Sequence, residues 1–343
     1  MTGRTMRALQ VVAPHHPPEL REVKVPEPAG TQVRLKVAGC GVCRSDLLAL
    51  DGAVPAAAMP FTLGHEIAGW VDAAGPEAAN LHEGDAYLVY APQGCGRCRE
   101  CRAGAENLCD HRAGLPALGL GRDGGIADYA LVDSPRHLVP LGDLDPRECG
   151  PLADAAVTAY HSVVRASTHL MPDSRVVVIG VGGLGHYAVQ LLARLGRASI
   201  VAVDTDADKL EYAVRLGANR GVLAGPGAAD DIRADPCKVL AVLDFVGNDA
   251  TLALAASVIN QRGTIIVNGM GGGSLSVGPR KLPSNVDLVF PYWGSLPELH
   301  DVVALASRGL IRTAAELVAL EDAVSAYERL RAGTVAGRFV IHP

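Results

Sequence analysis

The spacing of hydrophobic and polar residues divides this chain into two parts of different character. Up to about residue 150, short stretches alternate apolar and polar positions, as in 32–37, 67–71 and 87–90. Proline or glycine interrupts these stretches at short intervals. Alternation with period two, broken by turn residues, predicts short strands in an antiparallel barrel-like or irregular β domain.

From about residue 153 the pattern changes to strands and helices in alternation. The expected strands are 175–179, 199–203, 239–246 and 264–267, and the expected helices are 184–195 and 206–216. Strands that alternate with helices of this length predict a parallel sheet with crossover helices. A helix at 296–307 and a short strand at 339–341 are expected to return to the first domain.

Length and charge limit the classes of function. A chain of 343 residues predicts two domains, and a net charge of -6 provides no basic surface for nucleic acid or for a membrane. The longest apolar runs, such as 176–179, are too short to span a bilayer. The first twelve residues lack the features of a secretory signal. We therefore expect a cytoplasmic protein with no nucleic-acid or membrane partner.

A glycine-rich turn lies between the expected strand at 175–179 and the helix after it. Its sequence follows the pattern Gly-x-Gly-x-x-Gly, which lets the backbone approach a pyrophosphate at a helix N-terminus. This context predicts a dinucleotide-binding turn, and a structural turn without a ligand is the alternative. The residues expected to contact the dinucleotide are Gly180, Gly182, Gly183, Leu184 and Gly185.

The next strand ends in Asp204, nineteen residues after Gly185. A carboxylate there accepts hydrogen bonds from the adenosine ribose and repels a 2′-phosphate, which favours NAD over NADP. Lys209 lies one helical turn further and is expected to reach the same ribose.

Four of the eight cysteines fall within fifteen residues, with the spacing C-x2-C-x2-C-x7-C. Four thiolates in one loop favour a closed tetrahedral zinc site with a structural role. An iron–sulfur cluster is the alternative, but ferredoxin motifs continue with a shorter gap and then Cys-Pro. The expected zinc ligands are Cys95, Cys98, Cys101 and Cys109.

A second candidate metal site is more dispersed. Cys43 and the pair His65-Glu66 offer a thiolate, an imidazole and a carboxylate, which suit a catalytic zinc with an open coordination position. Spacing alone does not choose between Cys40 and Cys43, nor does it place His65 near either one. A redox pair formed by Cys40 and Cys43 is a further alternative.

Taken together, these motifs resemble the zinc-containing medium-chain alcohol dehydrogenases over nearly the whole chain. The matching segments are 41–46, 64–66, 95–109 and 180–185, and segments 151–160 and 291–294 look closest to bacterial secondary-alcohol dehydrogenases. The resemblance implies an α/β fold with two domains. A GroES-like catalytic domain would comprise 1–152 with 293–343, and a Rossmann domain with a doubly wound parallel sheet would comprise 153–292.

The resemblance implies that Cys43, His65 and Asp154 bind a catalytic zinc. Much of the family has a cysteine where Asp154 stands, and Cys149 falls five residues too early to replace it. A carboxylate also binds zinc, so the ligand set is complete. Glu66 is implied to lie just outside the ligands or to bind transiently, and Asp46 to orient His65.

The implied reaction is hydride transfer between NAD(H) and an alcohol or ketone. Ser45 resembles the hydroxyl that passes the alcohol proton outward, while Leu48 replaces a histidine that completes this relay in some members. Arg44 and Arg338 match positions that contact the cofactor pyrophosphate.

The substrate pocket is expected to be roomy and apolar, because the segment 53–59 is nearly all alanine and proline. Leu48, Leu118 and Trp293 are the candidate lining residues, with core packing as the alternative role. A bulky or cyclic secondary alcohol is the expected substrate, and a homo-tetramer or homo-dimer the expected assembly. Two alternatives are a biosynthetic reductase acting on a C=N, C=C or complex carbonyl group, and a catalytically silent NAD-binding or zinc-stabilised interaction protein.

Overall fold

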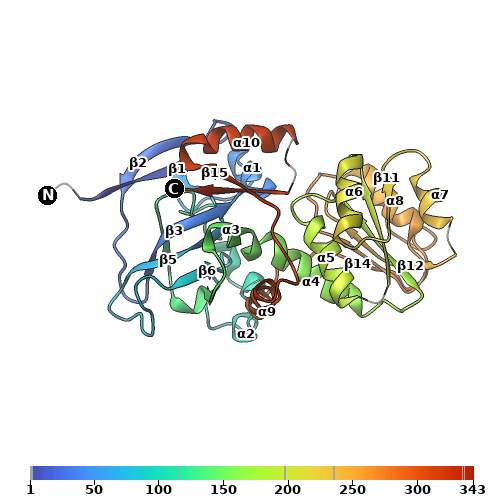
Figure 1. Cartoon of the computed structure of the whole chain (residues 1–343), viewed down its shortest axis with the longest axis horizontal. Helices are drawn as coiled ribbons and strands as arrows, with labels where there is room; N and C mark the ends of the chain where they lie inside the picture. Colours follow the sequence, from blue (N-terminus) through green and yellow to red (C-terminus); the bar gives the residue numbers. More distant parts are fainter. Residues whose placement is uncertain (1–2, 115, 197, 235, 334, 336) are drawn as a thin grey trace. The chain divides into compact units, whose positions relative to one another are not determined.

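The chain divides into two compact units in the computed structural model, which describes residues 3–114, 116–196, 198–234, 236–333, 335 and 337–343. Unit 1 comprises Met1–Val157 and Gly294–Pro343, and unit 2 comprises Thr158–Trp293. Unit 1 is therefore built from both ends of the chain, coloured blue to green and red in Figure 1. Within the described ranges, no helix has both the length and the apolar composition needed to cross a membrane.

Unit 1 is rich in short strands that pair mainly antiparallel. A three-stranded sheet has the order β2-β1-β4, and a seven-stranded sheet has the order β15-β16-β3-β5-β6-β8, with β7 also paired to β3. The first sheet contains β1 (Thr5–Val11), β2 (Glu19–Lys24) and β4 (Phe61–Thr62). The second contains β3 (Val33–Gly41), β5 (Glu66–Ala74), β6 (Ala86–Val89), β7 (Tyr129–Val132), β8 (Leu138–Pro140), β15 (Ala315–Ala319) and β16 (Arg338–His342).

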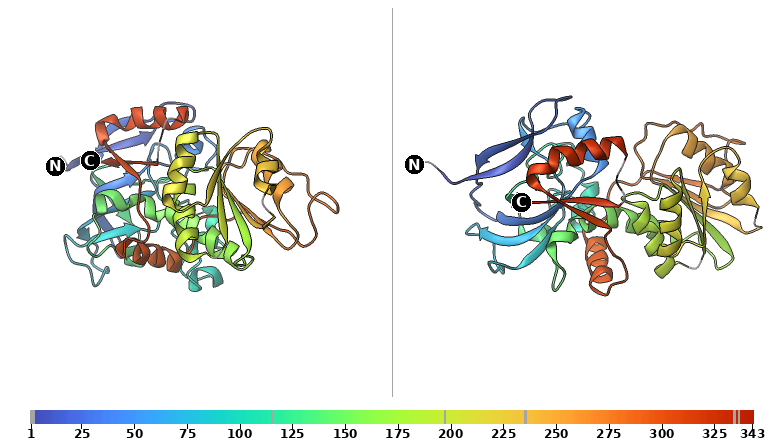
Figure 2. Two further views of the ribbon diagram at one scale, coloured as in Figure 1. Left: turned by 45° about the vertical axis from the view of Figure 1, so that its right-hand side comes forward. Right: turned by 45° about the horizontal axis from the view of Figure 1, so that its top comes forward.

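The C-terminal segment completes the larger sheet of unit 1. β16 pairs antiparallel with β3, at Val340 opposite Gly41, and β15 pairs parallel with β16. Figure 2 shows these red strands beside the blue N-terminal strands. The helices of unit 1 are α1 (Arg44–Leu50), α2 (Arg99–Arg102), α3 (Pro146–Cys149), α9 (Leu296–Ser307) and α10 (Ala323–Ala332), and α4 (Ala155–Ser167) begins in it.

Unit 2 contains a six-stranded parallel sheet with the order β11-β10-β9-β12-β13-β14. Every residue of β9 is buried, as expected for a central strand of a parallel sheet that helices cover on both faces. The strands are β9 (Ser174–Ile179), β10 (Ser199–Asp204), β11 (Arg220–Leu223), β12 (Lys238–Asp244), β13 (Thr264–Val267) and β14 (Asp287–Val289). The helices are α5 (Gly185–Leu195), α6 (Ala207–Leu216), α7 (Ala228–Arg233) and α8 (Asp249–Val258).

The strand order of unit 2 reverses beside β9, because β10 and β11 lie on one side of it and β12 to β14 on the other. Ligands of such sheets bind beyond the carboxyl ends of the strands at this reversal. The predicted glycine turn directly follows β9, so the topology places it at the expected position. The α/β fold class with a β-rich domain and a doubly wound parallel sheet is confirmed.

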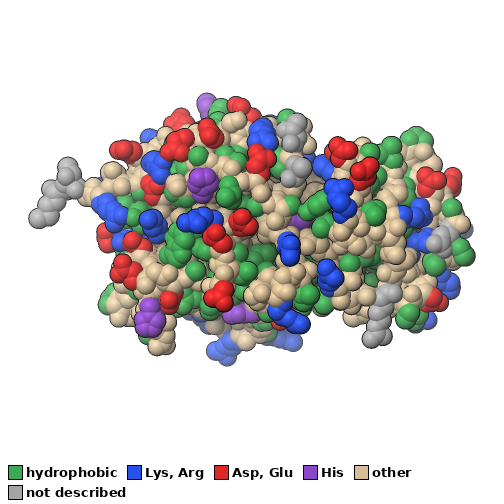
Figure 3. Space-filling view, in the orientation of Figure 1, with side chains coloured by type: hydrophobic (Ala, Val, Ile, Leu, Met, Phe, Trp, Pro, Cys, Tyr) green, Lys and Arg blue, Asp and Glu red, His purple; other side chains and the backbone are tan. Residues whose placement is uncertain are grey.

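One predicted strand ends at a different residue in the structure, and other elements were not predicted. The strand predicted at 239–246 stops at Asp244, because the buried Asp244 carboxylate accepts the N–H groups of Val246 and Gly247 and turns the chain. The helices α1, α2, α3, α4, α7, α8 and α10 were not predicted. On the face of the molecule drawn in Figure 3, acidic and basic side chains are interspersed.

Candidate metal centres

Four side chains with metal-binding atoms meet inside unit 1. Cys43 directly precedes α1, His65 and Glu66 stand at the start of β5, and Asp154 directly precedes α4. Their ligand atoms all lie within 4.8 Å of one another, and all four residues are buried. The fold thus brings together residues from three separate stretches of the chain that the sequence singled out.

The distances in this cluster fit a single small cation. His65 Nε2 lies 3.3 Å from Asp154 Oδ2, and Cys43 Sγ lies 3.4 Å from the same oxygen. Zinc bonds of about 2.0 Å to nitrogen or oxygen and about 2.3 Å to sulfur place neighbouring ligands of a tetrahedral site about 3.3 to 3.5 Å apart. The donor set of thiolate, imidazole and carboxylate therefore fits zinc in both chemistry and spacing.

Asp46 holds the cluster in place. Its Oδ1 lies 2.9 Å from His65 Nδ1, and its Oδ2 accepts the backbone N–H of Cys43 at 2.9 Å. The Tyr327 hydroxyl, from α10, donates to Oδ2 at 2.9 Å as well. A proton on Nδ1 facing Asp46 leaves the Nε2 lone pair of His65 directed toward Asp154, which is the arrangement that a metal-binding histidine needs.

Arg338 lies inside this cluster. Its side chain is buried, pairs with both oxygens of Glu66, and approaches Asp154 Oδ2 to 3.6 Å. The resemblance placed Arg338 at the cofactor pyrophosphate, and the structure adds contacts with two carboxylates that sequence analysis did not foresee. β16 supplies this arginine, so the C-terminal return of the chain contributes directly to the cluster.

The electric field of the cluster favours a cation. Burial alone lowers the pKa of His65, but Asp46 and Asp154 outweigh it, and the pKa lies well above the ordinary value. Cys40 is different, because burial raises the pKa of its thiol strongly, so that it stays protonated. The structure places Cys43, and not Cys40, in the cluster with His65 and Asp154.

The neighbouring predicted residues have different environments. Ser45 Oγ lies 3.3 Å from His65 Nε2. Arg44 is exposed at the first position of α1. Leu118 and Trp293 are buried and Leu48 is half-buried, and their contact with substrate stays a prediction.

The four cysteines of the lobe 95–109 also converge. Cys95 Sγ lies 3.9 Å from Cys101 Sγ, and Cys98 Sγ lies 4.0 Å from Cys109 Sγ. Zinc–sulfur bonds of about 2.3 Å place the sulfurs of a tetrahedral site about 3.8 Å apart. All four sulfurs therefore fit around one ion, which favours the zinc interpretation over an iron–sulfur cluster.

Backbone N–H groups prepare this lobe for metal. The N–H groups of Arg97 and Cys98 lower the pKa of Cys95 to about 6. The N–H groups of Cys101 and Asp110 likewise lower the pKa of Cys98. With a pKa of about 6, Cys95 is a thiolate at neutral pH, which is the form that binds metal. Burial has the opposite effect on Cys101 and raises the pKa of its thiol.

A buried glutamate between the last two cysteines anchors the lobe to the rest of unit 1. Glu106 Oε2 accepts the Gly94 N–H at 2.7 Å and the His137 Nε2–H at 3.1 Å, and Oε1 pairs with Arg136. Burial raises the pKa of Glu106, but His137 and Arg136 outweigh it and lower the pKa overall. Sequence analysis missed Glu106, because a single glutamate in a cysteine-rich loop carries no signal of burial.

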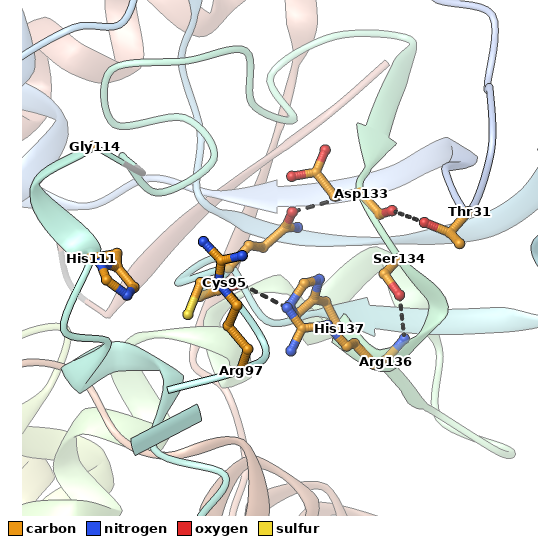
Figure 4. A pocket seen from close by; sticks show the side chains of 11 residues that line it. Thr31, Cys95, Arg97, His111, Gly114, Asp133, Ser134, Arg136 and His137 are labelled. Carbon is orange, nitrogen blue, oxygen red and sulfur yellow. Dashed lines mark hydrogen bonds between the residues drawn. The ribbon is translucent and has the colours of Figure 1, made fainter. Parts of the chain in front are cut away.

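A cavity of about 660 Å³ lies beside this lobe, and Figure 4 shows its lining. Arg97 extends between His111 and His137 in this view, with the Cys95 sulfur next to it. Among the described residues that line this cavity, none belongs to the cluster around Cys43.

The glycine turn in unit 2 has the geometry of a dinucleotide cradle. Gly180 has a φ of +85°, which other residues rarely adopt, and a side chain on Gly185 would collide with the Gly180 carbonyl oxygen at 1.9 Å. A Cβ on Gly182 would meet no atom within 4 Å, so the backbone there faces open space. This is the space into which a pyrophosphate would fit.

Asp204 lies at the end of β10 and is tied to the glycine turn. Its Oδ2 accepts the Val181 N–H at 2.7 Å, and its Oδ1 accepts the Asp206 N–H at 3.2 Å. These bonds hold the carboxylate beside the turn, where the ribose of a bound dinucleotide is expected. Lys209, within α6, is half-buried.

Two family models match this chain. Residues 29–143 match the alcohol dehydrogenase GroES-like domain, and residues 183–308 match the zinc-binding dehydrogenase domain. An NADP-dependent D-arabinose 1-dehydrogenase from Saccharolobus solfataricus is 34% identical, over 95% of each chain. An NAD-dependent alcohol dehydrogenase from Sulfurisphaera tokodaii is 32% identical, over 98% of this chain and 100% of the relative.

Solved structures agree with these matches. The crystal structure of an alcohol dehydrogenase from Aeropyrum pernix superposes with a TM-score of 0.91 at 32% identity, over 98% of this chain and all of that one. The D-arabinose dehydrogenase of Sulfolobus solfataricus superposes with a TM-score of 0.86 at 30% identity, over 99% of this chain and all of that one.

Proposed function

Because this chain belongs to the zinc-dependent medium-chain alcohol dehydrogenase family, we propose that it interconverts a bulky or cyclic secondary alcohol and its ketone with NAD. The buried cluster of Cys43, His65, Glu66 and Asp154 is the observation that carries this proposal. It combines a complete zinc ligand set with a hydroxyl, that of Ser45, at 3.3 Å from His65 Nε2.

Cys43, His65 and Asp154 are the residues that would hold the catalytic zinc. Zinc bound there supplies a Lewis acid that polarises the substrate oxygen. Glu66 stays close to the ligands while Arg338 neutralises it, and Asp46 fixes the orientation of His65. The four cysteines of the lobe would hold a second zinc with no open position, which serves stability.

Ser45 handles the proton in this proposal. Its hydroxyl accepts the proton of the substrate hydroxyl and donates its own proton outward. Leu48 stands where some members of the family have a histidine for this purpose, so the proton leaves without that group. The half-buried position of Ser45 is consistent with a proton that passes to the cofactor ribose or to water.

The cofactor binds at the glycine turn of unit 2, where NAD supplies the hydride acceptor. Gly182 leaves room for the pyrophosphate, and Asp204 accepts the ribose hydroxyls. The charge of Asp204 disfavours a 2′-phosphate. Arg44 is exposed at the start of α1 and is available to an anionic ligand, and Arg338 is assigned chiefly to Glu66.

The assembly proposed is a homo-oligomer, tetramer or dimer, in the cytoplasm. β14 is an edge strand of the parallel sheet, and Phe290, which follows it, is 67% exposed. An exposed sheet edge with a large apolar side chain beside it is suited to pairing with a second copy about a two-fold axis. All eight cysteines are free, as in proteins of a reducing compartment.

The test is a substrate panel with purified protein whose zinc content has been measured. We would supply NAD or NADP with ethanol, a linear secondary alcohol, cyclic secondary alcohols and D-arabinose, and follow absorbance of the reduced cofactor. The proposal expects cyclic secondary alcohols to exceed ethanol at least tenfold in kcat/KM. Equal rates for ethanol and the cyclic alcohols would refute the prediction of a roomy pocket. Turnover of D-arabinose alone would indicate that the substrate is an aldose, as the name of one relative states for that protein.

A further inference from the structure

We propose that Tyr327 is a positioning residue for the catalytic metal, because its hydroxyl holds Asp46 and Asp46 holds His65. The proposal rests on the zinc site assigned above, and it gives the C-terminal helix α10 a role in metal binding. None of the sequence motifs includes Tyr327, which lies 281 residues from Asp46 along the chain.

The contacts form a continuous path from α10 to the cluster. The Tyr327 hydroxyl donates to Asp46 Oδ2 at 2.9 Å, and Asp46 Oδ1 lies 2.9 Å from His65 Nδ1. His65 Nε2, on the other side of the ring, lies 3.3 Å from Asp154 Oδ2. Asp46 and His65 are fully buried and Tyr327 is 3% exposed, so water does not replace these bonds.

The hydroxyl of Tyr327 determines how the Asp46 carboxylate lies. The Cys43 N–H is the other donor to Oδ2, at 2.9 Å, so without Tyr327 the carboxylate would be held only by this N–H and by His65. With two donors on Oδ2, Oδ1 is directed at His65 Nδ1. Burial next to Asp46 raises the pKa of Tyr327 well above its ordinary value, so the hydroxyl keeps its proton and remains a donor.

Loss of this hydroxyl should weaken metal binding. Groups that orient metal-ligating histidines typically change metal affinity by about 10- to 100-fold. Tyr327 acts one residue further out than Asp46, so we expect Tyr327→Phe to speed release of the catalytic zinc by about tenfold. Release from the four-cysteine lobe should not change, since the lobe has its own hydrogen bonds.

Tyr90 provides a matched control. It is another fully buried tyrosine of unit 1, and its hydroxyl donates to the Gly294 carbonyl oxygen at 2.7 Å. The same hydroxyl accepts the Asn107 N–H, in the cysteine lobe, at 3.3 Å. Tyr90→Phe therefore removes the same atom from two buried hydrogen bonds without touching Asp46. If Tyr327 contributes only to the stability of unit 1, the two variants should change zinc release from the catalytic site equally.

The experiment follows zinc transfer from the holoenzyme to a coloured chelator and the visible spectrum of the enzyme with cobalt at the catalytic site. The expected result for Tyr327→Phe is about tenfold faster release of the catalytic zinc and a changed cobalt spectrum. Tyr90→Phe should release its catalytic zinc at the wild-type rate and keep the wild-type cobalt spectrum, and any faster release should come from the cysteine lobe, whose Asn107 N–H Tyr90 accepts. Unchanged release and spectrum in Tyr327→Phe, or equal changes in both variants, would overturn the proposal.

A double-mutant cycle tests the path through Asp46. Asp46→Asn should speed zinc release more than Tyr327→Phe does, and adding Tyr327→Phe to Asp46→Asn should have little further effect. Additive effects would contradict the path. A wild-type protein that binds only the zinc of the cysteine lobe would refute the proposed catalytic site itself, an outcome separate from a failure of Tyr327 alone.

Discussion

Replacement of Glu106 by glutamine should loosen the cysteine lobe from the rest of unit 1. In the wild type, three donors converge on this buried carboxylate, namely the Gly94 N–H and His137 on Oε2 and Arg136 on Oε1. The amide of glutamine offers one oxygen and two N–H groups. Whichever way it is turned, its nitrogen faces at least one of these donors.

The size of the stability loss follows from the orientation of the glutamine amide that costs less free energy. The amide oxygen keeps Gly94 and His137, and the amide nitrogen faces Arg136, which is partly exposed and can turn to water. This arrangement loses one hydrogen bond between charged groups, which contributes about 1.5 to 3 kcal/mol, and weakens two others. We expect a loss of roughly 2 to 4 kcal/mol in the stability of unit 1, or about 5 to 10 °C in thermal midpoint.

The assay compares thermal midpoints and the rate of zinc release from the cysteine lobe for Glu106→Gln and Glu100→Gln. Glu100 lies on α2 in the same lobe, so its replacement changes the charge of the lobe equally. We expect zinc release to accelerate only in Glu106→Gln, because in the wild type the Glu106 carboxylate orders the chain between Cys101 and Cys109. A Glu106→Gln protein within 1 to 2 °C of the Glu100→Gln midpoint (less than about 1 kcal/mol), with the same zinc release, would refute this reasoning.

Three further predictions concern unit 2. Burial lowers the pKa of His186 to about 4, below the unfolded value of 6.5, so stability present above pH 6.5 should be lost as the pH falls toward 4, by about 3 kcal/mol. Thermal midpoints against pH should show a flatter profile for His186→Asn and an unchanged one for the exposed control His82→Asn. Phe290→Asp should reduce the particle mass in analytical ultracentrifugation, and an unchanged mass would exclude pairing at β14. Asp204→Asn should raise the ratio of kcat/KM for NADP to that for NAD at least tenfold, about 1.4 kcal/mol, and a constant ratio would show that this charge does not select the cofactor.

Much of the fold was predictable because its signals are local. The buried strand β9 contains the continuous apolar run 176–179. Asp206 is the N-cap of α6, and its side chain accepts the Asp208 N–H. The glycine turn needs special backbone conformations at fixed offsets. The helix α10 was missed, and its buried face (Ala323, Ala326, Tyr327 and Leu330) packs against segments that are distant in sequence, such as α1.

The two metal sites differ in the same respect, because one is formed by near neighbours in the sequence and the other by distant residues. The cysteine lobe was predictable because its four ligands lie within one loop, where spacing alone limits the geometry. The cluster of Cys43, His65 and Asp154 could be predicted from the sequence only through the family resemblance, because 111 residues separate Cys43 from Asp154. Spacing along the chain cannot show that such residues meet.

The sequence by itself therefore determined the alternation of strands and helices from β9 to α6, the glycine turn and the chemistry of the candidate ligands, all of which depend on near neighbours. Cys43 rather than Cys40 joins His65, as the family resemblance implied, and only the tertiary structure decided that Arg338 pairs with Glu66. It also decided that Tyr327 supports Asp46. These contacts join residues more than twenty positions apart, and a side chain acquires such a partner only when packing of the whole unit removes both groups from water.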